Sequence, residues 1–253
     1  MQRLISTFNP ITLEEMKSVK LMNRIDTKFV TTMPQLLELL EMARKEYRIQ
    51  EIDGERNMLY HTVYFDTPDR TMYRVHQSGH TGRQKVRARS YVSSNLHFLE
   101  VKTKNNHGRT KKKRIAIDNA DLLNTALAEG ENAAFLGQTL RYDAKTLTPA
   151  MDNRFDRITL VNNAQTERLT IDTNLHFHNT TTGNDWYHEN LVVVELKRDG
   201  LCYSPVLEML HKLRIHPHGF SKYCMGSALT DSSLPLNRFK PKLIDVRKIL
   251  RTE

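Results

Sequence analysis

The sequence is poor in cysteine and contains no long apolar run. Its 253 residues include two cysteines, Cys202 and Cys224, so no disulfide framework is indicated and a reducing cytoplasm is the expected compartment. The first ten residues do not have the basic and then apolar layout of a signal peptide. No apolar stretch approaches the roughly 20 residues that cross a bilayer. A membrane role would therefore need a partner protein or a surface contact.

Common catalytic and nucleotide-binding motifs are also missing. The sequence has neither a G-x-x-x-x-G-K-[ST] loop nor a G-x-G-x-x-G loop. Its eleven histidines show no H-E-x-x-H spacing. His176 and His178 alternate on a predicted strand, but such pairs are more often surface residues than zinc ligands. The chemistry of this chain must therefore come from other side chains.

Positive charge is what the sequence has in excess. Lys and Arg number 38 against 29 Asp and Glu, a net charge of +9. This balance favours an anionic partner, such as nucleic acid, a phosphorylated small molecule, polyphosphate or an anionic membrane. No Pro- or Gly-rich linker divides the chain, so we expect one domain over residues 1–253. Its core would span about residues 11–229, followed by a basic helical extension at 230–253, which we interpret as a solvated amphipathic helix.

The charge is patterned most clearly between Arg83 and Lys104. Read with the two-residue period of a strand, the segment has two runs of polar residues on one face. These are Lys85, Arg87, Arg89 and Tyr91 in the first run, and Glu100, Lys102 and Lys104 in the second. Val86, Ala88, Leu99 and Val101 alternate with them. Because like charges on paired strands repel, this face costs stability unless a polyanion or carboxylates compensate.

The remaining patterns predict an antiparallel α+β protein. Helices are expected from the capping box at Thr12 to about Leu21, from Thr32-Pro34, from Asp118 to Gly130, from Ser204-Pro205 and near Leu243–Leu250. Strands are expected at Arg24–Val30, Tyr60–Asp66, Lys111–Ile117, from Asp156, at Glu167–Asp172 and at Leu191–Arg198. With the hairpin at Arg83–Lys104, this makes about eight strands that do not alternate regularly with helices.

A sheet that alternates cationic and apolar residues over many strands can close into a barrel with its polar face inside. Arginine supplies paired donors for phosphate oxygens, and lysine supplies a mobile point charge. Glu100 and Glu195 are the scarce carboxylates, able to hold a divalent cation or to orient a lysine. The alternative is a solvated antiparallel face. A nucleic-acid binder also stays open, although aromatic motifs of the RNP kind are absent.

The chain resembles a known family, the VTC domain, which is the polyphosphate polymerase module of the vacuolar transporter chaperone complex. The resemblance runs from Ile11 to Leu229 and is carried by nine short motifs in the same order. They are R-x-D-x-K-F from Arg24, Y-F-D-T from Tyr64, K-V-R-x-R-x-Y from Lys85, L-E-x-K from Leu99, K-K-x-R from Lys111, N-R at Asn153, E-R-L-T-I-D from Glu167, V-E-L-K from Val194 and F-S-K-Y from Phe220.

The resemblance implies a triphosphate tunnel metalloenzyme, that is, a closed antiparallel β-barrel of about eight strands with helices packed outside. It also implies synthesis of linear polyphosphate from ATP with a divalent metal, Mn²⁺ or else Mg²⁺. Carried over by motif, the catalytic residues are Arg87, Arg89, Lys102, Arg154 and Lys222. The residues that bind the phosphate chain are Lys28, Lys85, Lys104, Lys112, Arg114, Lys197 and Ser221. Glu195 is the implied metal ligand.

Three other functions stay open. Tunnel enzymes that hydrolyse triphosphates carry an E-x-E-x-K strand, whereas the strand here is Glu100-Val-Lys102-Thr-Lys104, with fewer carboxylates. This favours a polymerase over a triphosphatase. A non-catalytic polyphosphate or nucleotide sensor is the second alternative. Nucleic-acid binding comes last, and the oligomeric state is not indicated.

Overall fold

The computed structural model describes residues 1–17, 19, 24–106 and 110–251. Its strands are β1 (Asn9–Ile11), β2 (Arg24–Thr31), β3 (Tyr47–Gln50), β4 (Met58–Asp66), β5 (Gln84–Tyr91), β6 (Leu96–Lys104), β7 (Thr110–Ala116), β8 (Thr148–Asn162), β9 (Glu167–His178), β10 (Asp185–Tyr187) and β11 (Val192–Asp199). Its α-helices are α1 (Gln2–Ile5), α2 (Leu13–Lys17), α3 (Met33–Ala43), α4 (Thr71–Gln77), α5 (Gly130–Thr139), α6 (Pro205–Lys212), α7 (Lys222–Thr230) and α8 (Lys240–Arg251).

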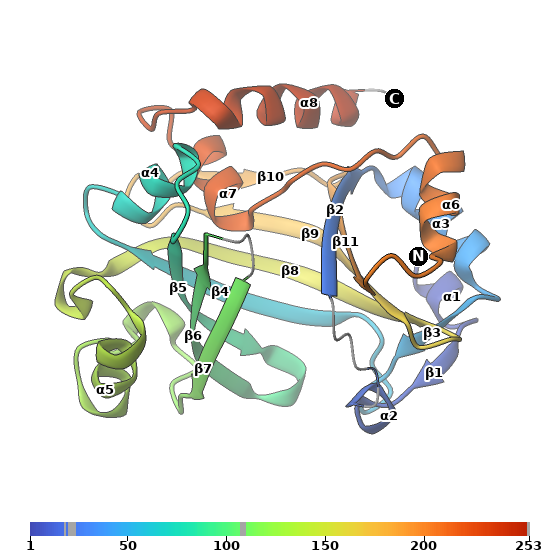
Figure 1. Cartoon of the computed structure of the whole chain (residues 1–253), viewed down its shortest axis with the longest axis horizontal. Coiled ribbons are helices and arrows are strands. Elements are labelled where there is room, and N and C mark those ends of the chain that lie inside the picture. The colour runs from blue at the N-terminus through green and yellow to red at the C-terminus, as the bar shows by residue number, and fades with distance from the viewer. Residues whose placement is uncertain (18, 20–23, 107–109, 252–253) are drawn as a thin grey trace.

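One long curled sheet organises the molecule (Figure 1). Its strands follow the order β2-β11-β9-β8-β4-β5-β6-β7, and the pairs along this path are antiparallel. β3 pairs with β8, β10 with β9, and β1 runs parallel to β3. Within the described residues, β2 and β7 do not pair with each other.

The sheet is therefore a curled half-barrel of eight strands, and the expected closed barrel is wrong. The mixed α and β composition and the antiparallel pairing are confirmed. Alternation of polar and apolar residues determines which face each side chain takes. It does not determine whether the two edges meet, because an open curled sheet satisfies the same alternation.

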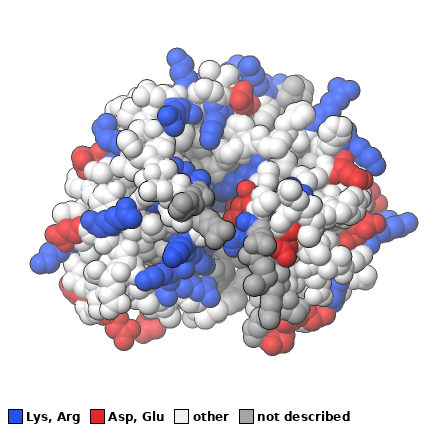
Figure 2. All heavy atoms as spheres, viewed as in Figure 1, with Lys and Arg blue, Asp and Glu red and all other residues white. Residues whose placement is uncertain are grey.

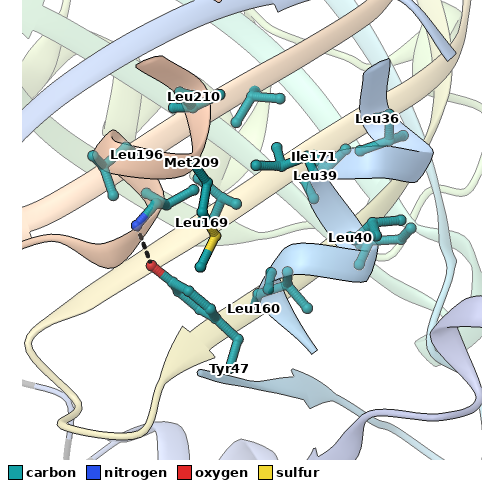
Figure 3. Close-up of a cluster of buried hydrophobic side chains, with 14 of the residues drawn as sticks. Leu36, Leu39, Leu40, Tyr47, Leu160, Leu169, Ile171, Leu196, Met209 and Leu210 are labelled. Carbon is teal, nitrogen blue, oxygen red and sulfur yellow. Dashed lines mark hydrogen bonds between the residues drawn. The ribbon is translucent and has the colours of Figure 1, made fainter. Parts of the chain in front are cut away.

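Helices α3 and α6 cover the outer face of β8, β9 and β11 (Figure 3). Leu169 and Ile171 alternate along β9, and both are fully buried against Leu36 and Leu39 of α3 and Leu210 of α6. Burial of each such side chain contributes about 1.5–3 kcal/mol relative to exposure. This packing fixes the outer face of three strands, so the intervening residues of the same strands point to the inner face.

A second apolar layer covers the outer face of β5 and β6. Val86 and Ala88 of β5 and Leu99 of β6 are fully buried and cluster with Leu136 of α5. These are the apolar residues that the sequence places between the cations. Lys85, Arg87, Arg89, Glu100 and Lys102 consequently face the inner side of the sheet.

Most of the expected helices are present. The capping box forms, because Thr12 N–H donates to Glu15 Oε2 at 2.8 Å and Glu15 N–H donates to Thr12 Oγ1 at 3.2 Å. The expected end of that helix near Leu21 lies outside the described residues. Helices begin at the two Pro-containing signals, and α8 forms the expected C-terminal helix.

The helix predicted from Asp118 to Gly130 is wrong. The chain makes a 3-10 turn at Leu122–Asn124, and α5 begins at Gly130 instead of ending there. Asn119 Oδ1 accepts a hydrogen bond from Asp121 N–H at 2.8 Å, and Asn124 Nδ2 donates to Asp121 Oδ2 at 2.7 Å. Local hydrogen bonds of Asn and Asp side chains compete with the helix, while Leu122 still reaches the core.

Candidate functional site

Two cations of the inner face are held by one buried carboxylate. Glu100 of β6 is fully buried and lies opposite Arg87 of β5. Arg87 Nε donates to Glu100 Oε2 at 2.6 Å, and Lys112 Nζ of β7 donates to Glu100 Oε1 at 3.0 Å. Burial raises the pKa of the Glu100 carboxyl, but Arg87, Arg89 and Lys112 outweigh it and hold the pKa below its ordinary value. Glu100 is thus an ionised counter-charge that fixes the two cations.

Asp172 plays the same part on the opposite side of the inner face. Arg157 of β8 donates to both of its carboxylate oxygens, at 2.5 and 2.7 Å, and Lys222 at the start of α7 also donates to it. Burial lowers the pKa of the Lys222 ammonium to about 7, although Asp172 opposes the shift. A bound phosphate would meet here a planar guanidinium and an amine that gains or loses its proton near neutrality.

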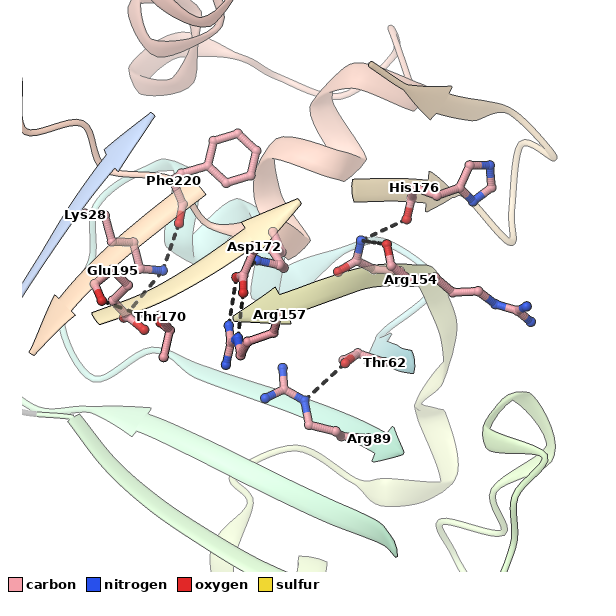
Figure 4. Close-up of polar contacts among 12 residues, drawn as sticks. Lys28, Thr62, Arg89, Arg154, Arg157, Thr170, Asp172, His176, Glu195 and Phe220 are labelled. Carbon is pink, nitrogen blue, oxygen red and sulfur yellow. Dashed lines mark hydrogen bonds and ion pairs between the residues drawn. The ribbon is translucent and has the colours of Figure 1, made fainter. Parts of the chain in front are cut away.

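Glu195 of β11 forms the third centre. Its carboxylate accepts a hydrogen bond from Lys197, and Lys28 Nζ of β2 lies 3.8 Å from Glu195 Oε1. Lys28 Nζ also donates to the carbonyl oxygen of Phe220 at 2.9 Å, which ties β2 to the segment before α7. Figure 4 shows this centre and the Arg157–Asp172 pair side by side on the inner face.

Other cations of the inner face have no carboxylate partner within the described residues. Arg89 Nε donates to Thr62 Oγ1 at 3.1 Å, and Lys85 Nζ donates to Ser221 Oγ at 2.7 Å. Arg87 and then burial hold the pKa of Lys102 well below its ordinary value. Figure 2 shows Lys and Arg gathered in the hollow of this face. We call the following set the cationic cluster: Lys28, Lys85, Arg87, Arg89, Lys102, Lys112, Arg157, Lys197 and Lys222.

The cationic cluster has nine members, and among the described residues three carboxylates contact it, those of Glu100, Asp172 and Glu195. Like charges packed this closely repel. Their arrangement is suited to a ligand with many negative oxygens, because each guanidinium and ammonium still has donors to offer.

The structure brings most of the predicted site residues together and sets a few apart. Eight of the nine members of the cationic cluster were predicted from the sequence as site residues. Ser221, also predicted, is the N-cap of α7 and accepts a hydrogen bond from Lys85. Lys104 is half-buried at the end of β6. Arg114 is exposed, and its guanidinium carbon lies 4.2 Å from the centre of the Phe98 ring.

Arg154 is the predicted residue that the structure places elsewhere. It is exposed, and Figure 4 shows its side chain pointing away from the cluster. Arg157, three residues on, takes the inner position. The signal was in the sequence, because Ile158 and Leu160 are apolar and face the helices. With the two-residue period of a strand, Arg154 falls on the same face as Ile158 and Leu160, and Arg157 falls on the other face.

Sequence reasoning also missed Asp172, Thr62 and Tyr64. Asp172 stands in the E-R-L-T-I-D motif, but its role depends on Arg157 across the strand pair. The Tyr64 hydroxyl accepts a long contact from Arg87 at 3.5 Å. Burial raises the pKa of the Tyr64 hydroxyl, but the nearby Arg87 and Arg89 outweigh it and lower the pKa below its ordinary value.

The residues fit a divalent cation only in company with phosphates. Among the described residues, no group of three His, Cys, Asp or Glu side chains is arranged to hold a metal ion. Each of the three inner carboxylates contacts Lys or Arg instead. Lys197 binds Glu195 Oε2, whereas Glu195 Oε1 lies 3.8 Å from Lys28 Nζ, beyond hydrogen-bond distance, so this oxygen could act as a single metal ligand. Mg²⁺ and similar ions are commonly held by one or two carboxylates plus substrate phosphates.

Two of the solved structures that share this fold are described as candidate cyclases. A candidate adenylyl cyclase from Hippeastrum with a dominant triphosphatase activity aligns at a TM-score of 0.52 and 16% identity, covering 84% of this chain and 98% of its own. A candidate adenylate cyclase from Bacillus halodurans aligns at 0.51 and 15%, covering 87% and 100%. Such low identities establish the fold alone. The chain thus has the fold class of the triphosphate tunnel proteins.

A comparison of the sequence with protein-family models identifies the family within that class. The model of the VTC domain matches residues 23–230, most of the chain, so the protein belongs to the VTC domain family. A sequence comparison with curated proteins found no match. In the described part of the chain, no helix is both long and apolar enough to cross a membrane. Membership of this family supports an activity on polyphosphate or on a triphosphate.

Proposed function

We propose that this protein is a polyphosphate polymerase that transfers the γ-phosphoryl group of ATP to the end of a growing chain. The observation that carries the proposal is the cationic cluster, in which nine cations lie on one face with three carboxylates. A chain of phosphates supplies negative oxygens at regular intervals along such a face. A single small anion would contact only a few of the nine cations.

Phosphoryl transfer needs placement and charge neutralisation more than it needs covalent chemistry from the protein. A terminal oxygen of the chain attacks the γ-phosphorus, the bond between that phosphorus and the β,γ-bridging oxygen breaks, and ADP leaves. Arg87, Arg89 and Arg157 offer planar donors to the equatorial oxygens of the moving group. Carboxylates already hold Arg87 and Arg157 in place, so little reorganisation is needed on binding.

The lysines have a second role, which is to hold the acceptor chain. Lys85 and Lys102 lie side by side on β5 and β6, and Lys85 Nζ donates to Ser221, the N-cap residue that precedes Lys222 in α7. A divalent cation, Mn²⁺ or Mg²⁺, held by Glu195 together with phosphate oxygens, supplies further neutralisation of charge when it is bound.

Hydrolysis is the second candidate, because a neighbour in fold has a dominant triphosphatase activity. A hydrolase needs a group that orients or deprotonates water. Glu100, Asp172 and Glu195 all contact Lys or Arg. Burial raises the pKa of each carboxyl, but these cationic partners outweigh it and hold the three pKa values below their ordinary value, so the carboxylates are ionised and weakly basic. This arrangement favours transfer to a phosphate acceptor over transfer to water.

The test is incubation of the purified protein with ATP and either Mn²⁺ or Mg²⁺, followed by gel analysis of chain length and a parallel assay for ADP. We expect long chains, with ADP released in proportion. Lys102→Ala is expected to abolish chain growth, and Arg154→Ala, on the outer face, serves as the matched control. Release of orthophosphate without chains would identify a triphosphatase. Tight binding of polyphosphate without turnover would identify a sensor.

A further inference from the structure

A cavity of about 450 Å³ opens at the end of the inner face where β4, β5 and β6 approach α2. Three leucines of its wall, Leu13, Leu59 and Leu96, are 49%, 40% and 52% exposed. Exposed leucines gathered around one cavity are typical of a ligand site. The volume lies in the range of about 300–1,000 Å³ that small-molecule sites have.

Another part of the cavity lining is aromatic. The rings of Tyr60 and Tyr91 lie edge to face with centres 4.9 Å apart, and those of Tyr91 and Phe98 do the same at 5.8 Å. Arg114 lies over Phe98 and lines the cavity as well. Aromatic faces next to a guanidinium form a platform on which a planar heterocycle stacks.

This platform adjoins the cationic cluster. The guanidinium carbon of Arg157 lies 4.9 Å from the centre of the Tyr60 ring, and that of Arg89 lies 5.5 Å from it. Tyr60 therefore belongs to both regions, because it lines the cavity and contacts two guanidinium groups of the cationic cluster. A ligand that spans them must join a planar apolar group to a chain of phosphates.

We infer that the cavity binds the base and ribose of a purine nucleoside triphosphate whose phosphates lie on the cationic cluster. The inference rests on the proposed function, which supplies the nucleotide. Gln50 and Ser93, also on the cavity wall, carry side chains that hydrogen-bond either donors or acceptors. A purine gains more from the platform than a pyrimidine does, because its stacking area is larger.

The order of residues along β5 sets the orientation of the bound nucleotide. Along β5, Tyr91 lies at the cavity, Arg89 and Arg87 follow, and Lys85 lies next to Ser221 at the other end. A base in the cavity therefore directs the γ-phosphate toward Lys85 and Lys102, where the acceptor chain is proposed to lie.

The test is calorimetric titration with two ligands in Mg²⁺ buffer, the β,γ-imido analogue of ATP and inorganic tripolyphosphate. Phe98→Leu keeps an apolar side chain and removes the aromatic face. We expect it to weaken binding of the ATP analogue by about fivefold to tenfold, the lower part of the range for base stacking. Binding of tripolyphosphate should change by less than twofold. Ser93→Trp, at an exposed position, fills the cavity and should have the same selective effect.

The outcomes separate this inference from the proposed function. Equal losses for both ligands, or no loss for either, would overturn the cavity as the nucleoside site even if the wild type makes polyphosphate. A selective loss in a protein that makes no polyphosphate would keep the cavity and reject the polymerase. Failure of the wild type to bind the ATP analogue would reject both. Circular dichroism of each variant confirms that it is folded.

Discussion

Arg154 and Arg157 are three residues apart in the sequence and take opposite faces of one strand. Arg157 is bound to Asp172 on the inner face, whereas Arg154 is exposed on the outer face. A side chain that holds phosphate through charge-assisted hydrogen bonds contributes a few kcal/mol, and loss of one partner from a desolvated charged pair costs about 2–5 kcal/mol.

We therefore expect Arg157→Ala to lower the affinity for tripolyphosphate at least tenfold, and Arg154→Ala to leave it within twofold. Calorimetric titration of both variants measures this, and their thermal unfolding separates a binding defect from a folding defect. If Arg154→Ala were the more damaging change, the assignment of faces on β8 would be wrong.

Lys222 predicts a pH dependence. Burial lowers its pKa to about 7. Below pH 7 the side chain carries its proton and attracts phosphate, and as the pH rises through 7 it loses that proton. Loss of this proton should weaken the binding of tripolyphosphate between pH 6 and pH 8, and it opposes the titration of the ligand, which gains negative charge over the same range.

Lys222→Arg is the matched variant for this prediction, because a guanidinium stays charged over the whole range. The ratio of wild-type to variant affinity cancels the titration of the ligand. We expect that ratio to decrease as the pH rises, and a ratio that is flat from pH 6 to pH 8 would show that Lys222 does not titrate in this range.

Among the elements, α4 and α7 depend on one buried carboxylate. Asp66, at the end of β4, accepts hydrogen bonds from the backbone N–H groups of Met72 and Tyr73 at 2.9 Å each, and from the Tyr223 hydroxyl. It is fully buried. The carboxylate thus satisfies free N–H groups at the start of α4 and connects that helix to α7, which carries Lys222.

Asp66→Ala should destabilise the protein by about 2–4 kcal/mol, because it leaves several buried donors without an acceptor. Urea-induced unfolding measures the change. Asp69→Ala is the matched control. Within the described residues, the side-chain partners of Asp69 are exposed threonine hydroxyls of the same turn. A similar loss in both variants would contradict the role given to Asp66.

Elements with strong local signals were predictable, and those set by partners distant in sequence were not. The alternation around Arg87 and Glu100 determines their face because Val86 and Leu99 must be buried. Pro34 and Pro205 mark helix starts through fixed backbone geometry. Asp118–Gly130 misleads because helical spacing of leucines cannot outweigh the Asn and Asp side chains that bond locally there. Asp172 gains its role from Arg157 on another strand, and no local pattern reports that.

The whole molecule carries a net charge of +9, and much of the excess lies on the inner face. A ligand that binds the folded state alone raises its stability, by about 2.7 kcal/mol at a concentration 100 times its Kd. Tripolyphosphate should therefore raise the melting temperature, and added NaCl should reduce the effect because salt screens charge. Sulfate at equal ionic strength is the control. An equal rise with sulfate would indicate a general salt effect instead of a site for linked phosphates.

Closure of the sheet is a whole-molecule property that the sequence does not report, and the open edge has a consequence for local motion. β7 pairs with β6 alone among the described strands, yet it supplies Lys112 to the cationic cluster. Its alternate amides face solvent, so their protons should exchange with deuterium faster than those of β5. A bound phosphate chain that contacts Lys112 would hold this strand in place and slow that exchange. The deuterium uptake of residues 110–116 is thus a local readout of whether the inner face is occupied.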